Sequence, residues 1–204
     1  MAENTPLYQD YLALMDSMRG YASPKAKLTT LIKSGKIIKI RRGLYVTPGG
    51  QEASKRILAN KIYGPSYISF EYALSFYGLI PERAHTVTCA SMGKNKNKLF
   101  HTPAGDFSYQ SIPPIVYPHG VLRMEEVAGP FLIASREKAL CDTLSKTGGL
   151  TGIPSLEALL YDDLRMEKEA VDSLSVRDVG ALASLYGKKT IRLLLEYLKK
   201  RNKP

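Results

Sequence analysis

The pattern of hydrophobic and polar positions divides the chain into a short first part and a longer second part. Hydrophobic residues recur at helical spacing over residues 6–19 and again over residues 24–34, which predicts two helices. Ser23 and Pro24 suit the N-cap and first turn of the second helix, and Gly35 suits its end. The apolar stripe on this second helix is narrow, so its opposite face is left for solvent or a partner.

After Gly35 the pattern changes from helical spacing to alternation. Two isoleucines alternate with Lys39 and Arg41 before the turn Arg42-Gly43, and a second run of strand-forming residues follows up to residue 47. Two such runs around a glycine turn predict a β-hairpin. A helical pattern followed by a hairpin is the order of elements in a winged-helix DNA-binding domain.

Pro48-Gly49-Gly50 interrupts the pattern and predicts a boundary between a first domain of residues 1–50 and a second domain of residues 51–204. The expected helices of the second domain are residues 51–63, 70–77, 135–146, 155–164, 175–186 and 188–200. The expected strands are residues 67–69, 85–90, 98–102, 107–110, 121–127 and 131–134. We therefore predict an α+β fold: a winged-helix-like domain, then a mostly antiparallel sheet flanked by helices, then a helical C-terminus.

The chain is strongly basic, but its charge is unevenly placed. It has 29 lysines and arginines against 19 aspartates and glutamates, for a net charge of +10. Residues 1–50 carry +5 and residues 188–204 carry +6, whereas residues 51–187 are close to neutral at −1. Residues 23–47 hold seven basic residues and no acidic one. Two basic ends on a neutral body indicate local contacts with a polyanion.

The basic residues of this stretch fall on one face of the expected helix and on the expected hairpin. Polar side chains on a recognition helix meet base edges and phosphates in the major groove, and a narrow minor groove attracts arginine. We therefore expect the first domain to bind double-stranded DNA; the alternative is a solvated, lysine-rich surface without a partner. The candidate contacts are Lys25, Lys27, Thr30, Lys33 and Ser34 on the helix and Lys39, Arg41 and Arg42 on the hairpin.

The basic C-terminal stretch is a second candidate for contact with nucleic acid. Its apolar residues predict a helix that leaves five cations outside: Lys188, Lys189, Arg192, Lys199 and Lys200. Cations in a last helical turn also complement the helix dipole, so a charged helix end without a partner is an equal alternative. An RNA- or protein-interaction module that holds an anionic partner with its basic ends is the alternative to the DNA reader.

The sequence offers little support for catalysis or metal binding. The three histidines are isolated and lack the spacing of metal sites, and we find no glycine-rich nucleotide loop. Ser135, Lys138 and Lys146-Thr147-Gly148 match two penicillin-recognising signatures, but they fall within one expected helix and its end. We interpret that match as chance, and we expect no enzymatic activity, no metal and no cofactor.

The sequence also favours a reduced, cytoplasmic setting away from membranes. Residues 1–10 are polar and do not resemble a signal peptide, and no run approaches the ~20 apolar residues of a membrane span. Cys89 and Cys141 lie far apart in apolar surroundings, which does not suggest a disulfide framework.

Three blocks of the sequence carry a resemblance to a known family. Residues 64–82 (GPSYISFEYALSFYGLIPE), the preceding residues 40–46 (IRRGLYV) and the later residues 131–142 (FLIASREKALCD) resemble motifs of AbiEi-type antitoxins. Together the resemblance spans residues 23–161. The motif positions in residues 64–82 are Tyr67, Ser69, Glu71, Tyr72, Gly78 and Pro81. This block also fits a buried strand–helix unit, with Ser69 as N-cap and Gly78 as the stop.

The family consists of regulators from type IV toxin–antitoxin (abortive-infection) loci. The resemblance implies a winged-helix domain that represses its own operon and a C-terminal antitoxin domain. The implied functional partner is a nucleotidyltransferase-like toxin, without need of a stable complex, and no catalytic residue carries over. A winged helix usually has three helices before its hairpin, whereas we can place two. A small reader contacts few phosphates, so specificity requires two copies on inverted repeats upstream of its gene.

Overall fold

The first part of the chain is a small sheet with two helices packed on one side. The structure, a computed structural model, describes residues 8–48, 55–94 and 96–201. Its first elements are β1 (Tyr8–Asp10), α1 (Tyr11–Ser17), α2 (Pro24–Lys33), β2 (Ile38–Arg41) and β3 (Leu44–Val46). The three strands are antiparallel in the order β1-β3-β2. The predicted second helix and hairpin are confirmed, and two helices precede the hairpin within residues 8–48, so a complete winged helix is not confirmed.

The helix predicted over residues 6–19 is wrong at its start. Residues 8–10 form β1, which pairs with β3 and sets Asp10 opposite Leu44. Asp10 then begins α1 as its N-cap, because its carboxylate accepts a hydrogen bond of 2.8 Å from the amide of Ala13. A strand of three residues is too short to show alternation, so the helical spacing that follows it concealed the strand.

The small sheet lies between two hydrophobic cores. On one face Tyr45 packs with Leu14 and Leu28 of the two helices. On the other face Leu44 and Val46 join the main core of the second part. Successive strand residues point to opposite faces, which is why Tyr45 and its neighbours serve different cores. The hairpin is therefore packed from both sides.

Within residues 55–94 and 96–201, six strands form one mixed sheet. They are β4 (Ser66–Ile68), β5 (Val87–Met92), β6 (Lys98–Thr102), β7 (Gly105–Ile112), β8 (Val121–Glu126) and β9 (Gly129–Ala134). Their order is β6-β7-β5-β4-β9-β8. The pairs β6·β7, β4·β5 and β8·β9 are antiparallel, whereas β5·β7 and β4·β9 are parallel. The sheet is therefore mostly antiparallel, as expected, but by three pairings to two.

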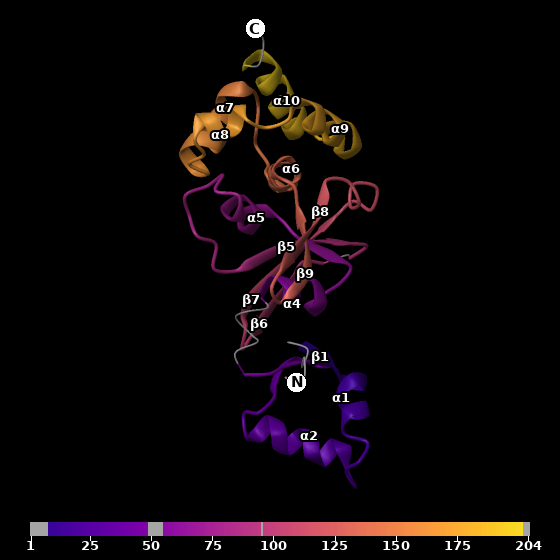
Figure 1. Ribbon diagram of the computed structural model, residues 1–204. Helices are drawn as coiled ribbons and strands as arrows, with labels where there is room; N and C mark the ends of the chain where they lie inside the picture. Colours follow the sequence, from indigo (N-terminus) through magenta and orange to yellow (C-terminus); the bar gives the residue numbers. More distant parts are fainter. Residues whose placement is uncertain (1–7, 49–54, 95, 202–204) are drawn as a thin grey trace.

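Helices cover both faces of this sheet and form the C-terminal end of the molecule. They are α4 (Lys55–Ile62), α5 (Phe70–Phe76), α6 (Arg136–Lys146), α7 (Ile153–Glu157), α8 (Lys168–Asp172), α9 (Val176–Tyr186) and α10 (Lys189–Arg201). In Figure 1, α4 lies on one side of the sheet and α5 and α6 on the other, with α7–α10 beyond α6. The α+β fold with a helical C-terminus is thereby confirmed.

Two helical predictions differ from the structure in detail. The single helix expected over residues 155–164 is α7 followed by a π-helical turn, η1 (Ala158–Asp163). The short helix α8 was not predicted. The start of the helix expected over residues 51–63 lies outside the described residues. No helix in the described ranges is long and apolar enough to cross a membrane.

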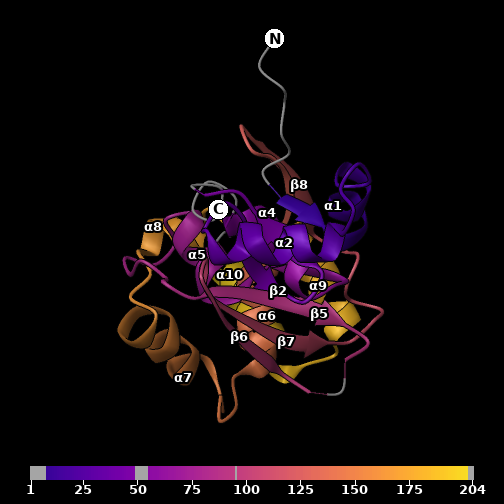
Figure 2. The ribbon, with the colours of Figure 1, turned by 90° about the horizontal axis from the view of Figure 1, so that it is seen from below.

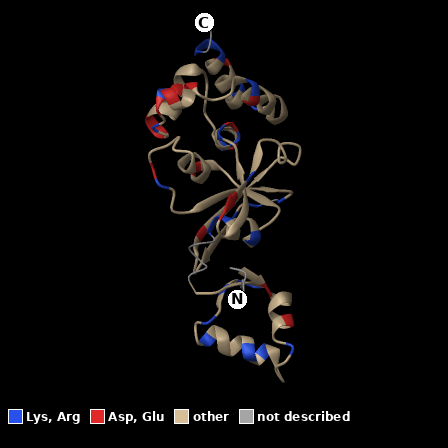
Figure 3. Ribbon diagram, viewed as in Figure 1, with Lys and Arg blue, Asp and Glu red and all other residues tan. Residues whose placement is uncertain are grey.

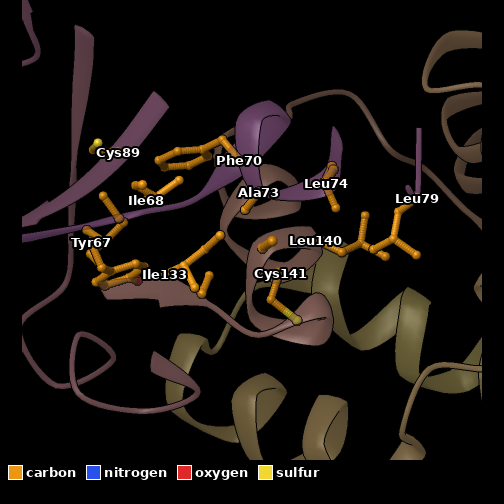
Figure 4. Close-up of a cluster of buried hydrophobic side chains, with 14 of the residues drawn as sticks. Tyr67, Ile68, Phe70, Ala73, Leu74, Leu79, Cys89, Ile133, Leu140 and Cys141 are labelled. Carbon is orange, nitrogen blue, oxygen red and sulfur yellow. The ribbon is translucent and has the colours of Figure 1, made fainter. Parts of the chain in front are cut away.

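The main core is continuous from the sheet into the helices. Ile68 of β4 and Ile133 of β9 are partners in the sheet and are fully buried. Figure 4 shows them beside Ala73 of α5 and Leu140 of α6. Burying each large aliphatic side chain stabilises the fold by about 1.5–3 kcal/mol. This core holds the blocks at residues 64–82 and 131–142 against each other.

Candidate nucleic-acid interface

The predicted polar face of α2 is exposed at one end of the molecule. Lys25 and Lys33 are exposed. Lys27 is half-buried, because its ammonium group lies over the ring of Tyr21 at 4.5 Å from the centroid. In Figure 2, α2 is the element nearest the viewer, so the body does not cover it. The helix can therefore approach a large, flat or grooved partner.

The helices α1 and α2 are consecutive and are joined by a turn. Residues 18–23 connect them, and Gly20 lies within this turn. Leu14 of α1 and Leu28 of α2 are both buried in their shared core. In Figure 1 the two helices meet at a corner instead of lying side by side. Lys25 and Lys33 of α2 stay exposed outside this shared core.

The hydroxyl groups predicted to read bases are exposed but engaged within the helix. Thr30 donates to the carbonyl of Ala26 at 3.1 Å, and Ser34 donates to the carbonyl of Leu31 at 3.2 Å. Each hydroxyl oxygen can still accept a hydrogen bond. In this conformation Thr30 and Ser34 thus present acceptors, which match the amino groups of cytosine and adenine.

The three cations of the hairpin, Lys39, Arg41 and Arg42, are all exposed, but their surroundings differ. Arg41 donates a hydrogen bond to the carbonyl of Ile62, and its guanidinium carbon lies 5.9 Å from the centre of the Phe100 ring. A β-bulge between Lys39 and Arg41 shifts the register at this point. Among the described residues, the side chains of Lys39 and Arg42 have no hydrogen-bond or ion-pair partner, so both can meet an external anion, whereas Arg41 ties the hairpin to the second part.

Within residues 8–48, no carboxylate pairs with the cations of α2 or the hairpin. Within residues 8–48 the ion pair between basic and acidic side chains is Arg19–Asp16, at 2.6 Å. Asp10 is engaged as the N-cap of α1. Figure 3 shows blue segments along α2 without red ones beside them. A polyanion would therefore meet this face without displacing an internal partner.

The basic C-terminal helix lies at the opposite end of the molecule from α2 (Figure 3). All five predicted cations are exposed, as expected: Lys188, Lys189, Arg192, Lys199 and Lys200. Lys189 donates to the carbonyl of Thr151 at 3.1 Å, and Arg192 donates to that of Gly187 at 2.8 Å. These two side chains tie the helix to neighbouring backbone. The two basic regions cannot contact the same short stretch of duplex.

The motif positions of residues 64–82 separate into buried and exposed groups. Tyr67 and Ser69 are fully buried, and both donate hydrogen bonds to Oδ2 of Asp142, at 2.9 and 2.6 Å. Ser69 is the N-cap residue of α5, as predicted, but its hydroxyl makes no capping hydrogen bond and donates to Asp142 instead. Tyr72 is half-buried, and the exposed motif positions are Glu71, Gly78 and Pro81. Gly78 ends the helix with a φ of 66°, as expected.

The carboxylate of Asp142 belongs to a buried ion pair on α6. Lys138 Nζ lies 3.2 Å from Asp142 Oδ1, and neither side chain has exposed surface. The same ammonium donates to the hydroxyl of Tyr186 at 2.8 Å and to the carbonyl of Val116 at 3.3 Å. Tyr186 in turn donates to Asp142. This cluster joins β4, α6 and α9 through side chains alone.

The protonation of this cluster is set mainly by burial. Burial lowers the pKa of Lys138, and the neighbouring Asp142 carboxylate partly opposes that effect. Burial first and Asp142 second raise the pKa values of Tyr67 and Tyr186 far above their ordinary value. Because no member is open to solvent at the ion pair, the cluster acts as a structural tie. The i, i+4 spacing of Lys138 and Asp142 beside Leu140 and Cys141 was its only trace in the sequence.

The remaining residues considered for catalysis or metal binding make local structural contacts. Ser135 is the N-cap of α6 and accepts a hydrogen bond of 3.2 Å from the amide of Lys138. His101 Nδ1 lies 2.8 Å from Asp106 on the exposed β6·β7 hairpin. Among the residues that the structure describes, there is no group of three or more His, Cys, Asp or Glu side chains that could hold a metal ion.

No protein-family model matches the chain, and no curated protein matches it significantly in sequence.

Proposed function

We propose that this protein is a DNA-binding repressor of its own operon that also serves as the antitoxin of a type IV toxin–antitoxin pair. The DNA-binding part of this proposal rests on the exposed basic face of α2 and the exposed cations of the hairpin. Lys25 and Lys33 stand on that face, and Lys39 and Arg42 stand on the hairpin. We propose no enzymatic activity and no cofactor for it, and a cytoplasmic location.

In the proposed complex α2 enters the major groove and the hairpin follows the neighbouring backbone. Lys25 and Lys27 lie in the first turn of α2, the part of a recognition helix that reaches base edges. Lys33, Lys39 and Arg42 contact phosphates, and Lys25 and Lys27 also neutralise phosphate charge at the edges of the groove. Neutralising about five phosphates gives a slope of about −4 to −5 in a plot of log affinity against log salt. One copy is therefore a weak reader, and useful specificity comes from two copies on inverted repeats.

The antitoxin half rests on the resemblance to AbiEi-type antitoxins. In the fold, residues 64–82 and 131–142 meet at one point, where Tyr67 and Ser69 bond to Asp142. Two resembling blocks that are distant in sequence therefore form one structural unit. The functional partner in this proposal is a nucleotidyltransferase-like toxin, and no stable complex with it is required.

A second candidate is binding of single-stranded RNA, and one observation favours it. Tyr63 and Phe100 are half-buried with ring centroids 5.7 Å apart, beside Arg41 and Lys94. Aromatic rings flanked by cations form stacking platforms for unpaired bases. This surface lies beside β6, apart from the exposed face of α2.

Two experiments test the proposed function. Footprinting of the DNA upstream of the gene should show protection of an inverted repeat, and expression with the gene next to it should relieve that gene's toxicity. Competition with RNA separates the two candidates. Displacement of the upstream duplex by single-stranded RNA, and equally by random duplex, would support the RNA-binding alternative and contradict the repressor.

A further inference from the structure

The strand β8 forms one edge of the six-stranded sheet. Among the described residues it pairs with β9 alone, so the backbone groups on its outer side have no strand partner. Leu122 on β8 is 43% exposed, and Val127 at the turn after it is fully exposed. Figure 2 shows the hairpin of β8 and β9 projecting from the body. A free edge of this kind can pair with another strand.

The two edges of the sheet carry different charges. The opposite edge, β6, begins at Lys98 and is preceded by Lys96 and Lys94, with no carboxylate among them. Edge lysines are a common protection against pairing, because two such edges repel. β8 instead carries Arg123 and Glu125, both exposed and ion-paired to each other within the chain. Charges of both signs do not protect an edge against a copy of itself.

The order of residues along β8 is self-complementary about Met124. In antiparallel pairs, opposite residues share the same hydrogen-bonding type, so a two-fold axis must face a residue. An axis at Arg123 sets two arginines opposite each other, and an axis at Glu125 sets two glutamates opposite each other. An axis at Met124 sets Arg123 opposite Glu125 of the second copy, and the reverse. Opposite charges across a strand pair stabilise it, whereas like charges destabilise it.

We propose that two copies of this chain pair through antiparallel β8 strands, with the two-fold axis at Met124. The pairing continues the sheet from one copy into the other. Arg123 and Glu125 of each copy then form a four-residue charge network, and Val121 faces Val127 of the other copy. Glu126 keeps its contact of 2.9 Å with Arg56 within its own chain. The pairing does not depend on DNA, although a two-fold dimer suits inverted repeats.

Charge reversal tests this interface. Sedimentation velocity over a range of protein concentrations should show a monomer–dimer equilibrium for the natural chain. Arg123→Glu alone and Glu125→Arg alone should each weaken the dimer at least ~10-fold, because each places like charges opposite each other. An equimolar mixture of the two variants should restore dimerisation. One variant then carries carboxylates at both positions and the other carries guanidinium groups at both, so opposite charges face each other across the mixed pair.

A matched variant and a folding check keep the test decisive. Lys98→Glu on the opposite edge should leave the dimer unchanged, and far-ultraviolet circular dichroism should show that all variants fold. A natural chain that stays monomeric up to about 1 mM overturns the pairing. The proposed pairing is also overturned if Arg123→Glu and Glu125→Arg each leave the dimer dissociation constant unchanged. Because these measurements contain no DNA, they can contradict the dimer without contradicting the proposed repressor function.

Discussion

The guanidinium of Arg41 donates a hydrogen bond to the backbone carbonyl of Ile62, the last residue of α4. A helix C-terminus carries partial negative charge, so it suits this cation. The bond joins the hairpin to the second part of the chain, and the cores on either side of the small sheet reinforce it. The hairpin is thus held in one orientation, and Lys39 and Arg42 are its cations available to DNA.

Alanine substitution of Arg41 and of Arg42, which are adjacent in sequence, should therefore have different effects: one on stability and the other on DNA binding. Arg42→Ala should reduce the salt slope of DNA binding by about 0.9, the value for one lost phosphate contact, without changing the melting temperature. Arg41→Ala should lower stability by about 0.5–1.5 kcal/mol, because a partly buried hydrogen bond is lost. Salt titrations and urea unfolding measure the two effects. Equal salt slopes for Arg42→Ala and the natural chain would show that Arg42 does not contact DNA.

The cations of α2 should dominate the electrostatic part of binding. Lys25→Ala with Lys33→Ala should reduce the salt slope by about 2. The matched control is Lys199→Ala with Lys200→Ala, which removes the same charge from the opposite end of the molecule (Figure 3). Fluorescence anisotropy with a labelled duplex at several salt concentrations compares the two double variants. A larger reduction of the salt slope in the control variant would indicate that DNA binds at the C-terminal helix instead.

Loss of one partner of the buried Lys138–Asp142 ion pair should destabilise the fold much more than replacement of both partners by apolar residues. Asp142→Ala should destabilise the fold by about 3–5 kcal/mol, because it leaves Lys138 buried without its carboxylate. Lys138→Met with Asp142→Leu should lose much less, because well-packed apolar residues can replace such a pair. Urea unfolding of the natural chain and both variants gives the comparison. An Asp142→Ala variant within about 1 kcal/mol of the natural chain would show that the pair is not a structural tie.

Gly120 should be sensitive to substitution because it lies against the same lysine. Its φ is 70°, and an added Cβ would lie 2.9 Å from Cβ of Lys138. Gly120→Ala combines a strained backbone with this clash, so it should lower stability by about 1–3 kcal/mol. Gly35→Ala is the control, since Gly35 has a similar φ of 69° with nothing within 4 Å. Thermal unfolding should show the larger loss for Gly120→Ala, and equal losses would contradict the close approach.

The stability of the protein should fall in alkali. Burial raises the pKa of Tyr67, Tyr109 and Tyr186 above 10.0, so these hydroxyls keep their protons in the folded state when the unfolded chain loses them. Their contribution is complete below the ordinary pKa of 10.0 and is lost as the pH rises toward the raised values. Lys138 and Lys146 have the opposite sign, because burial lowers their pKa values. The tyrosines whose pKa burial raises outnumber these two lysines, so we expect the net effect to be a loss of stability.

Tyr109→Phe isolates one of these groups. Tyr109 donates to the carbonyl of Ala59 at 2.6 Å inside the core. Without its hydroxyl, the loss of unfolding free energy above about pH 10 should become less steep by up to about 1.4 kcal/mol per pH unit. The measurement is urea unfolding from about pH 9 to about pH 11.

Local patterns predicted much of the fold, whereas long-range side-chain contacts could not be read from the sequence. The strand expected at residues 98–102 coincides with β6, because turn residues bound it on both sides. β1 was missed since its three residues depend on pairing with β3. The contact of Arg41 with Ile62 and the bonds of Tyr67 and Ser69 to Asp142 join residues far apart in sequence. Spacing along the chain carries no record of such contacts.

For the candidate site, too, local patterns could be predicted from the sequence but long-range contacts could not. Sequence charge located the exposed cations of α2 and the hairpin, because an amphipathic helix and a hairpin turn each leave a solvent side. It did not separate Arg41 from Arg42, which have the same charge and neighbouring positions but different partners. That separation required the tertiary packing of the hairpin against α4.

If α2 recognises a specific DNA sequence, the protein must distinguish its own operator from other duplex DNA. The natural chain is titrated, by fluorescence anisotropy at physiological salt, against the inverted repeat upstream of its own gene and against a scrambled duplex of equal length and composition. We predict at least ~10³-fold tighter binding to the inverted repeat. Equal affinity for the two duplexes would contradict the account.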